Sequence, residues 1–223
     1  PTEFTWSQRD KDGKVVSTDK YTPLSFYNKL WGYDLNNDYV LVMNDPSREY
    51  YKVYQIEYDR HTYDGHDWVY LNLPNEEVKP MLIASLKDST AMYISCDVNK
   101  FLNRQKGVMD LKNFDYESLL GVTMTMDKKE RIITHASASS HAMTLIAVDI
   151  NKATSKPTKW MVENSWGKEN GFKGNYIMTD EWFNEYMFRF VLNKKYVPES
   201  VAKLLKQKPI KLPAWDPMFA PEE

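Results

Sequence analysis

Short apolar runs recur along the whole chain, and most of them have the character of β-strands. Runs rich in Val, Ile, Tyr, Phe and Trp are typical of strands. The strands that this pattern predicts are Tyr39–Met43, Tyr50–Tyr58, Trp68–Leu73, Ala91–Val98, Ala142–Ile150, Lys159–Val162, Tyr176–Met178 and Phe188–Leu192. Because a few amphipathic segments interrupt these strands, the pattern predicts a protein of the α+β class.

Apolar positions three and four residues apart, together with capping signals, predict the helices. Thr22 followed by Pro23 opens one helix, and Asn75 is expected to cap another. The further helical segments expected are Pro74–Lys87, Asp115–Leu120, 127–133, a short helix from Thr179, and Pro198–Lys206. Before all of these, Asp12-Gly13 is a strong turn signal and predicts a hairpin within residues 1–20.

The stretch 139–167 carries the candidate chemistry. Its two apolar runs flank the polar connector Asn151–Pro157, whose residues favour turns, so we expect a β-hairpin. With a midpoint near Lys152–Ala153, His141 and Asn164 would be directly opposed, with Cβ atoms about 5 Å apart. An amide oxygen at that distance can accept from one imidazole nitrogen and leave the other free to act as a base.

The other candidate side chains are expected to have supporting or structural roles rather than catalytic ones. Trp166 can shield the hydrogen bond between His141 and Asn164 from water, but indole has no acid–base function near neutral pH. His61 and His66 flank a predicted turn without a third ligand at suitable spacing, so no metal site is expected. A further histidine, at position 135, lies in a polar run and is expected at the surface.

Cys96 is the only thiol in the chain, and it lacks the surroundings of a nucleophile. Reactive cysteines usually lie at a helix N-terminus or beside a cation, whereas Cys96 ends an apolar strand beside Asp97. A buried structural role is therefore expected. A single Cys also excludes an internal disulfide and fits a reducing cytosol.

Composition narrows the range of functions only slightly. Apolar residues make up 42% and aromatic residues 14% of the chain, which suits a packed globular protein. A formal net charge of −2 gives no reason to expect binding to nucleic acid or membranes. No apolar run approaches the roughly 20 residues needed to span a bilayer.

Four strings in the second half of the chain give a more specific indication. They are Ser140-His141-Ala142-Met143, Val162-Glu163-Asn164-Ser165-Trp166-Gly167, Met178-Thr179-Asp180-Glu181-Trp182-Phe183 and Leu212-Pro213-Ala214-Trp215-Asp216-Pro217-Met218. Together they resemble the C-terminal half of the bleomycin hydrolase / bacterial aminopeptidase C family of papain-like cysteine peptidases. The resemblance implies the papain-like fold, mainly its antiparallel β-barrel (right) domain with peripheral helices. Residues 1–212 would form this β-rich half.

The same resemblance implies a cysteine aminopeptidase that acts on peptides with a free N-terminus and needs no metal or organic cofactor. His141 and Asn164 would be catalytic and Trp166 supporting. The family's nucleophilic Cys lies in an N-terminal half, so we expect this chain to need that half as a partner and to be inactive alone. The family also implies a cytoplasmic homo-hexamer. An alternative is a catalytically inert module with an assembly or binding role.

Residues 213–223 contain three prolines, which exclude a regular helix or sheet. The resemblance implies that this C-terminal arm is directed toward the active-site cleft, where its carboxylate receives the substrate's amino group. Glu222 and Glu223 would then position the substrate. The arm departs from the family pattern because Phe219 stands where a Gly is usual, and its acidic ending leaves open how many residues are removed from the substrate.

Overall fold

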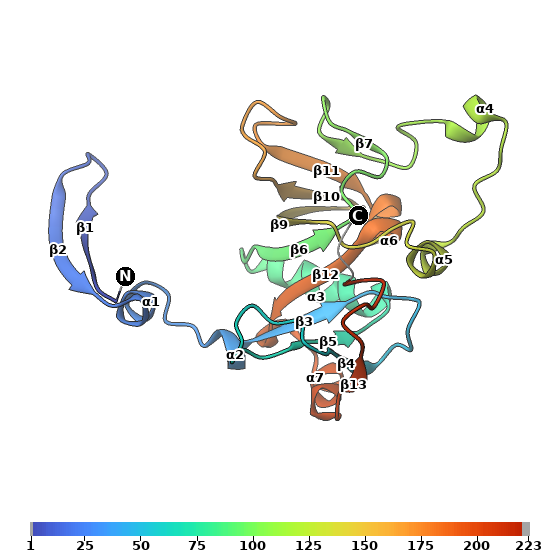
Figure 1. Cartoon of the computed structure of the whole chain (residues 1–223). Helices are drawn as coiled ribbons and strands as arrows, with labels where there is room; N and C mark the ends of the chain where they lie inside the picture. Colours follow the sequence, from blue (N-terminus) through green and yellow to red (C-terminus); the bar gives the residue numbers. More distant parts are fainter. Residues whose placement is uncertain (1, 220–223) are drawn as a thin grey trace. The chain divides into compact units, whose positions relative to one another are not determined.

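The computed structural model describes residues 2–219 (Figure 1). The chain divides into two compact units, Pro1–Asp38 and Tyr39–Glu223. The α-helices and strands are β1 (Phe4–Arg9), β2 (Val15–Tyr21), α1 (Pro23–Leu30), α2 (Leu35–Asp38), β3 (Tyr39–Met43), β4 (Lys52–Ile56), β5 (Trp68–Asn72), α3 (Asn75–Lys87), β6 (Met92–Cys96), β7 (Leu102–Asn103), β8 (Val108–Met109), α4 (Tyr116–Leu120), α5 (Lys128–Ile133), β9 (His141–Ile150), β10 (Pro157–Glu163), β11 (Asn175–Thr179), α6 (Asp180–Tyr186), β12 (Met187–Asn193), α7 (Glu199–Ala202) and β13 (Ile210–Leu212). Two short 3₁₀ helices are η1 (Lys194–Tyr196) and η2 (Lys203–Lys206).

The first unit contains the predicted hairpin and the predicted helix. β1 and β2 pair antiparallel, and Gly13 in the connecting turn has a φ of +81°, which glycine adopts without strain. Thr22 caps α1 by accepting from the Ser25 backbone N–H, and Ser25 bonds back to Thr22 in a capping box. Aromatic rings pack between the hairpin and α1, namely Phe4, Trp6, Tyr21 and Phe26.

The second unit is organised around one large sheet whose strand order is β13-β4-β5-β3-β12-β6-β9-β10-β11-β8-β7. Most neighbours are antiparallel, and the parallel pairs are β3 with β5, β4 with β13, and β8 with β11. The α+β class is therefore confirmed. Within residues 2–219, β13 and β7 end the order and do not pair with each other, so closure into the expected barrel stays a prediction.

Two core clusters lie on opposite faces of this sheet. Successive residues of a strand point to opposite faces, and Val42 and Leu71 belong to one cluster while their neighbours Met43 and Tyr70 belong to the other. Helices α3, α6 and α7 pack on the first cluster, and α5 with Leu212 and Met218 packs on the second. Burying each large apolar side chain contributes about 1.5–3 kcal/mol, so these clusters fix the sheet that carries the candidate site.

Two predicted helices differ from the structure in their ends. Asn75 does not cap α3: Pro74 occupies the N-cap position, and the Asn75 side chain instead donates to Asn184 Oδ1 at 3.2 Å. The segment expected as one helix over Pro198–Lys206 is a short α-helix followed by the 3₁₀ turn of η2. By contrast, Asp127 caps α5 in a capping box, as the sequence of that segment predicts.

Candidate active site

The predicted hairpin is formed by β9 and β10, but its register differs from the expected one. Thr144 is opposite Glu163, and continuing that register places Met143 rather than His141 opposite Asn164. The predicted direct opposition of His141 and Asn164 is therefore wrong.

The connecting loop explains the shift. The Asn151 backbone N–H donates to Lys156 O at 2.9 Å, and the Asn151 side chain accepts from the Ala153 N–H at 2.9 Å. This side-chain turn closes the loop between Asn151 and Lys156, so the hairpin is centred about one residue later than the composition of the connector suggests.

His141 and Asn164 nevertheless meet at the end of the hairpin. His141 Nε2 lies 2.8 Å from Asn164 Oδ1, and the Ser165 backbone N–H donates to the same oxygen at 2.7 Å. The Asn164 N–H donates to Gly174 O at 3.0 Å, which holds Asn164 beyond the end of β10. Because the Ser165 N–H can only donate, the shared atom is the amide oxygen, so the imidazole donates through Nε2–H. In the neutral ring Nδ1 then carries no proton and can act as a base.

Trp166 packs against the imidazole. Its ring centroid lies 4.9 Å from that of His141, and it meets Tyr176 edge to face at 5.7 Å. The Arg104 guanidinium carbon lies 4.4 Å from the Trp166 ring centroid, a cation–π contact that further holds the indole. Sequence reasoning missed Arg104, because nothing in its local sequence signals a contact with a residue so distant in the chain.

Cys96 lies close to His141 in the sheet without joining it chemically. The two residues are register partners in β6 and β9, but within residues 2–219 the Cys96 thiol forms no hydrogen bond with the His141 ring. The Cys96 side chain is completely buried in the first core cluster. Burial raises the pKa of its thiol, and the neighbouring charge of Asp97 raises it further, so the thiol stays protonated at neutral pH.

A hollow of about 440 Å³ adjoins Asn164, whereas His141 is not among the residues that line it. It is lined by Asn164 and Ser165 and by side chains of the neighbouring strands, among them Tyr93 and Ala142. Asn164 is only 8% exposed, and its Nδ2 has no hydrogen-bond partner within residues 2–219.

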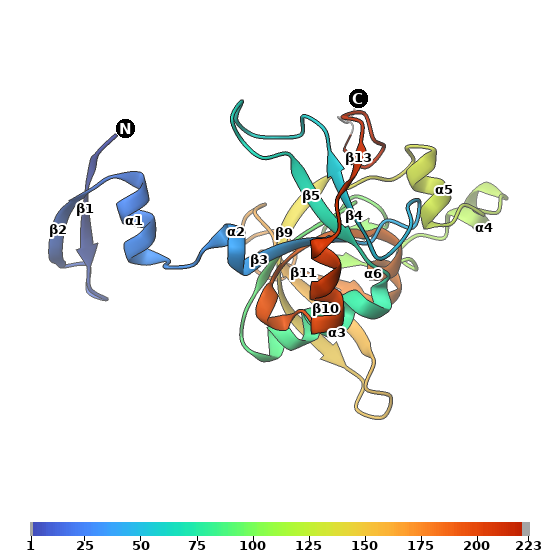
Figure 2. The same ribbon diagram turned by 90° about the horizontal axis from the view of Figure 1, so that it is seen from below.

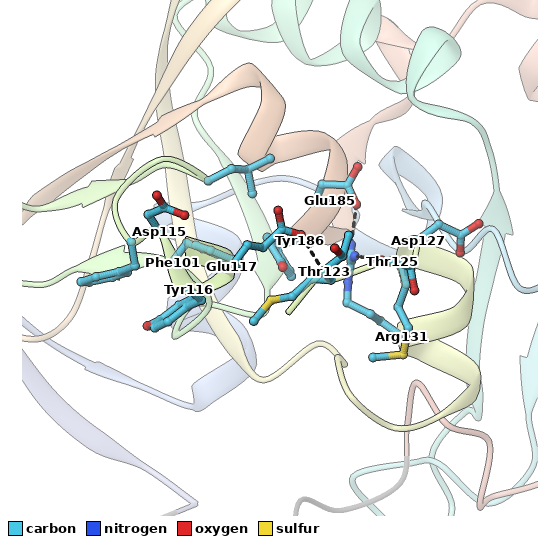
Figure 3. A pocket seen from close by; sticks show the side chains of 14 residues that line it. Phe101, Asp115, Tyr116, Glu117, Thr123, Thr125, Asp127, Arg131, Glu185 and Tyr186 are labelled. Carbon is cyan, nitrogen blue, oxygen red and sulfur yellow. Dashed lines mark hydrogen bonds and ion pairs between the residues drawn. The ribbon is translucent and has the colours of Figure 1, made fainter. Parts of the chain in front are cut away.

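A larger groove of about 770 Å³ lies elsewhere on the second unit (Figure 3). Tyr116 and Tyr186 lie along it, and Arg131 forms an ion pair with Glu185 while its guanidinium carbon lies 5.0 Å from the Tyr186 ring centroid. The groove contains neither member of the imidazole–amide pair, so it adds nothing to the chemistry of that pair.

The remaining predicted residues lie apart from the pair. His61, His66 and His135 are exposed. Glu222 and Glu223 lie outside the described residues. In residues 2–219 we find no group of three or more His, Cys, Asp or Glu side chains arranged to hold a metal ion, and no helix with the length and apolar character that a bilayer crossing requires.

Comparisons with known proteins agree with the fold and with the family that the quoted strings resemble. Residues 1–219 match the Peptidase C1-like family. The chain is 42% identical to human bleomycin hydrolase over 99% of its own length and 50% of that protein. It is 37% identical to aminopeptidase C of Lactobacillus delbrueckii subsp. lactis over 99% of the chain and 49% of that protein. The crystal structure of PepW from Lactobacillus rhamnosis superposes with a TM-score of 0.91 at 34% identity, over 99% of this chain and 50% of that one.

The class of protein is that of the papain-like peptidases. Two observations define it: a large, mainly antiparallel sheet with an imidazole–amide pair at the end of one hairpin, and a close structural match to a papain-like peptidase. The chain belongs to the Peptidase C1-like family. It spans about half the length of the curated relatives it matches.

Proposed function

We propose that this chain supplies the general base and its orienting amide to a cysteine aminopeptidase that removes N-terminal residues from peptides. The observation that carries the proposal is the bond from His141 Nε2 to Asn164 Oδ1, which leaves Nδ1 free for proton transfer. Family membership, with bleomycin hydrolase and aminopeptidases as relatives, supports the reaction class.

The nucleophile must be a thiol other than Cys96. A completely buried thiol with a raised pKa cannot present a thiolate to a peptide bond. We therefore propose that a Cys outside these 223 residues, in an N-terminal half of the same peptidase, faces His141 Nδ1.

The geometry supports a two-step acyl transfer. His141 Nδ1 takes the proton of the thiol, and the thiolate attacks the scissile carbonyl carbon to give a thioester and release the amine, which leaves with that proton. The imidazole then accepts a proton from water, the resulting hydroxide hydrolyses the thioester, and the thiol is regenerated. Asn164 acts by holding the ring through Nε2–H in both steps, and Trp166 excludes water from that bond.

The specificity for N-terminal residues belongs to the same proposal. Glu222 and Glu223 would receive the free amino group of the substrate by charge-assisted hydrogen bonds. A cytoplasmic location and a hexameric assembly of the complete peptidase are proposed on the same family grounds. The alternative is an inert module with an assembly or binding role.

An aminopeptidase assay separates these possibilities. The chain is mixed with the Cys-bearing half and offered a fluorogenic peptide with a free amino group, and the wild type is compared with His141→Ala and Cys96→Ser. We expect activity only with both halves, lost in His141→Ala and kept in Cys96→Ser. Activity of this chain alone, or activity of the two halves that His141→Ala leaves intact, would each contradict the proposal. Inactivity of the two halves together favours the inert module.

A further inference from the structure

Three side chains from separate segments are stacked at the candidate site. The Trp166 ring centroid lies 4.9 Å from that of His141, and the two ring planes are tilted by 36°. The Arg104 guanidinium carbon lies 4.4 Å from the Trp166 ring centroid. Arg104 belongs to the short connection between β7 and β8, whereas His141 begins β9. The indole therefore links a cation near one end of the strand order to the imidazole.

Backbone contacts fix the turn that carries Arg104. The Gly107 N–H donates to Asn103 O at 2.9 Å, which closes the turn between β7 and β8. Gly107 O accepts from the Ile177 N–H at 2.8 Å, which fastens the turn to β11. The φ of Gly107 is +67°, and a Cβ added there would lie 2.5 Å from Gly171 Cα. The position of the Arg104 backbone relative to β11 is therefore set by its neighbours on both sides.

The indole of Trp166 is also held from its other sides. Asn170 Nδ2 donates to Trp166 O at 2.6 Å, and the Tyr176 ring meets the indole edge to face at 5.7 Å. Tyr176 lies on β11, and β9, β10 and β11 are side by side in Figure 1 and Figure 2. Burial raises the pKa of the Tyr176 hydroxyl, and the charge of Arg104 opposes that rise, so the guanidinium acts on the same corner of the core.

The hydrogen bond from His141 Nε2–H to Asn164 Oδ1 is the part of the site that this stack protects. The bond is 2.8 Å long, and the Trp166 indole lies against the ring that donates it. Such a bond is stronger where water is excluded. Arg104 is exposed, and an exposed cation–π contact shifts an equilibrium roughly twofold to fivefold. Loss of the guanidinium should therefore let the indole move away from the imidazole more often.

From this arrangement we propose that Arg104 is a positioning residue: its guanidinium holds the Trp166 indole against His141 and so keeps water from the bond to Asn164. The contribution of this contact to catalysis rests on the proposed function. Its effect on the access of water to the imidazole proton does not, and can be measured on this chain alone.

The exchange of the His141 Nε2–H proton with water, measured by NMR from the transfer of water saturation, tests the contact. Arg104→Gln removes the cation and keeps a polar side chain. Lys106→Gln is the matched control, because it removes the same charge from an exposed residue of the same turn. We expect Arg104→Gln to raise the exchange rate roughly twofold to fivefold, the effect of losing one exposed cation–π contact. Lys106→Gln should match the wild type, and Arg104→Lys should lie closer to the wild type than Arg104→Gln because it keeps a cation.

A second proton distinguishes this local effect from a general loosening of the fold. The Trp160 indole N–H donates to Asp180 Oδ1 at 2.9 Å, and Trp160 is 1% exposed. Its exchange with water reports the opening of the core around β10. We expect the same rate for this proton in the wild type and in Arg104→Gln. An equal rise for both protons would overturn the positioning role.

The contribution to catalysis is tested in the complete peptidase with a fluorogenic peptide that carries a free amino group. The orientation of the imidazole matters for proton transfer and not for binding of the peptide. We therefore expect Arg104→Gln to lower kcat roughly twofold to fivefold with KM unchanged, and Lys106→Gln to change neither.

The outcomes separate the two proposals. An exchange rate that Arg104→Gln leaves unchanged, or that Lys106→Gln raises equally, overturns the positioning of the indole. Faster exchange in Arg104→Gln with an unchanged kcat overturns the contribution to catalysis. A complete wild-type peptidase without activity overturns the proposed function, while the exchange rate still decides whether Arg104 holds the indole in place.

Discussion

Replacing Lys128 by Met should remove most of the pH dependence of stability between pH 7 and 8.5. Lys128 is the first residue of α5, and its Nζ donates to Asn44 Oδ1 and to Met187 O, both at 2.6 Å. The ammonium group also lies 4.7 Å from the Phe188 ring centroid. None of these partners carries a negative charge, so the cation is buried without an ion pair in the described part of the chain.

Burial lowers the pKa of Lys128 to about 7, although Glu185 and Asp45 act in the opposite direction. Arg131 and Lys79 lower the pKa further. In the unfolded chain a Lys has a pKa of about 10.4. Between these two values the unfolded chain binds a proton that the folded chain lacks, so the free energy of unfolding rises with pH.

The slope is about 1.4 kcal/mol per pH unit for one group, so the rise from pH 7 to 8.5 is about 2 kcal/mol. Below pH 7 both states bind the proton, and this contribution no longer changes. Above about pH 8.5 the Cys96 thiol acts in the opposite direction, because it ionises in the unfolded chain before it does in the folded one.

Urea unfolding followed by Trp fluorescence at pH 6, 7, 7.75 and 8.5 measures this slope. Wild type and Lys128→Met are compared with Lys129→Met, which removes a neighbouring exposed lysine. We expect the wild type and Lys129→Met to gain about 2 kcal/mol over this range relative to Lys128→Met. Equal slopes in wild type and Lys128→Met would refute the assignment of a buried, titrating lysine.

Three further changes test the packing around the site and the arm. Asp216→Asn should lower the free energy of unfolding, measured in urea, by about 1–3 kcal/mol. The reason is that Asp216 is only 1% exposed and its carboxylate is the ion-pair partner of the Arg48 guanidinium. A loss below about 0.5 kcal/mol would show that this ion pair contributes little. Gly107→Ala should lower the free energy of unfolding by about 1–3 kcal/mol in the same assay. The reason is that Gly107 has a φ of +67° and a Cβ added there would lie 2.5 Å from Gly171 Cα. Unchanged stability would contradict this close approach of the two backbones. The Cys96 thiol should react with a chromogenic disulfide reagent only after unfolding, since it is completely buried and its pKa is raised. Reaction in the native protein at a rate near that of a free thiol would show that β6 opens.

Features fixed by adjacent residues could be predicted from the sequence. The Thr22 and Asp127 caps are set by side chains that bond to backbone groups three residues away, so the local sequence contains both partners. The strands could also be predicted, because each shows its apolar run or its apolar and polar alternation within a few adjacent residues. The hairpin register could not be read in this way, because the Asn151 side chain decides where the loop closes, and composition alone does not locate that turn.

In the candidate site, too, contacts within one hairpin could be predicted and contacts between distant segments could not. His141 begins β9 and Asn164 follows β10, so both lie at the open end of one hairpin. Spacing therefore brought them together in the prediction even though the register was wrong. Arg104 over Trp166 and Arg189 against the arm are contacts between residues distant in the chain. Nothing in the sequence near either arginine indicates its partner, and only the packed structure identifies it.

The most direct test of the central claim is the tautomer of His141, measured by ¹⁵N NMR of the imidazole nitrogens with assignment from His141→Gln. The bond to Asn164 Oδ1 predicts that the neutral ring carries its proton on Nε2 and leaves Nδ1 unprotonated, and that Asn164→Ala mixes the two forms. A proton on Nδ1 in the wild type, or a tautomer that Asn164→Ala does not change, would contradict the claim that this chain holds an imidazole ready to act as a base.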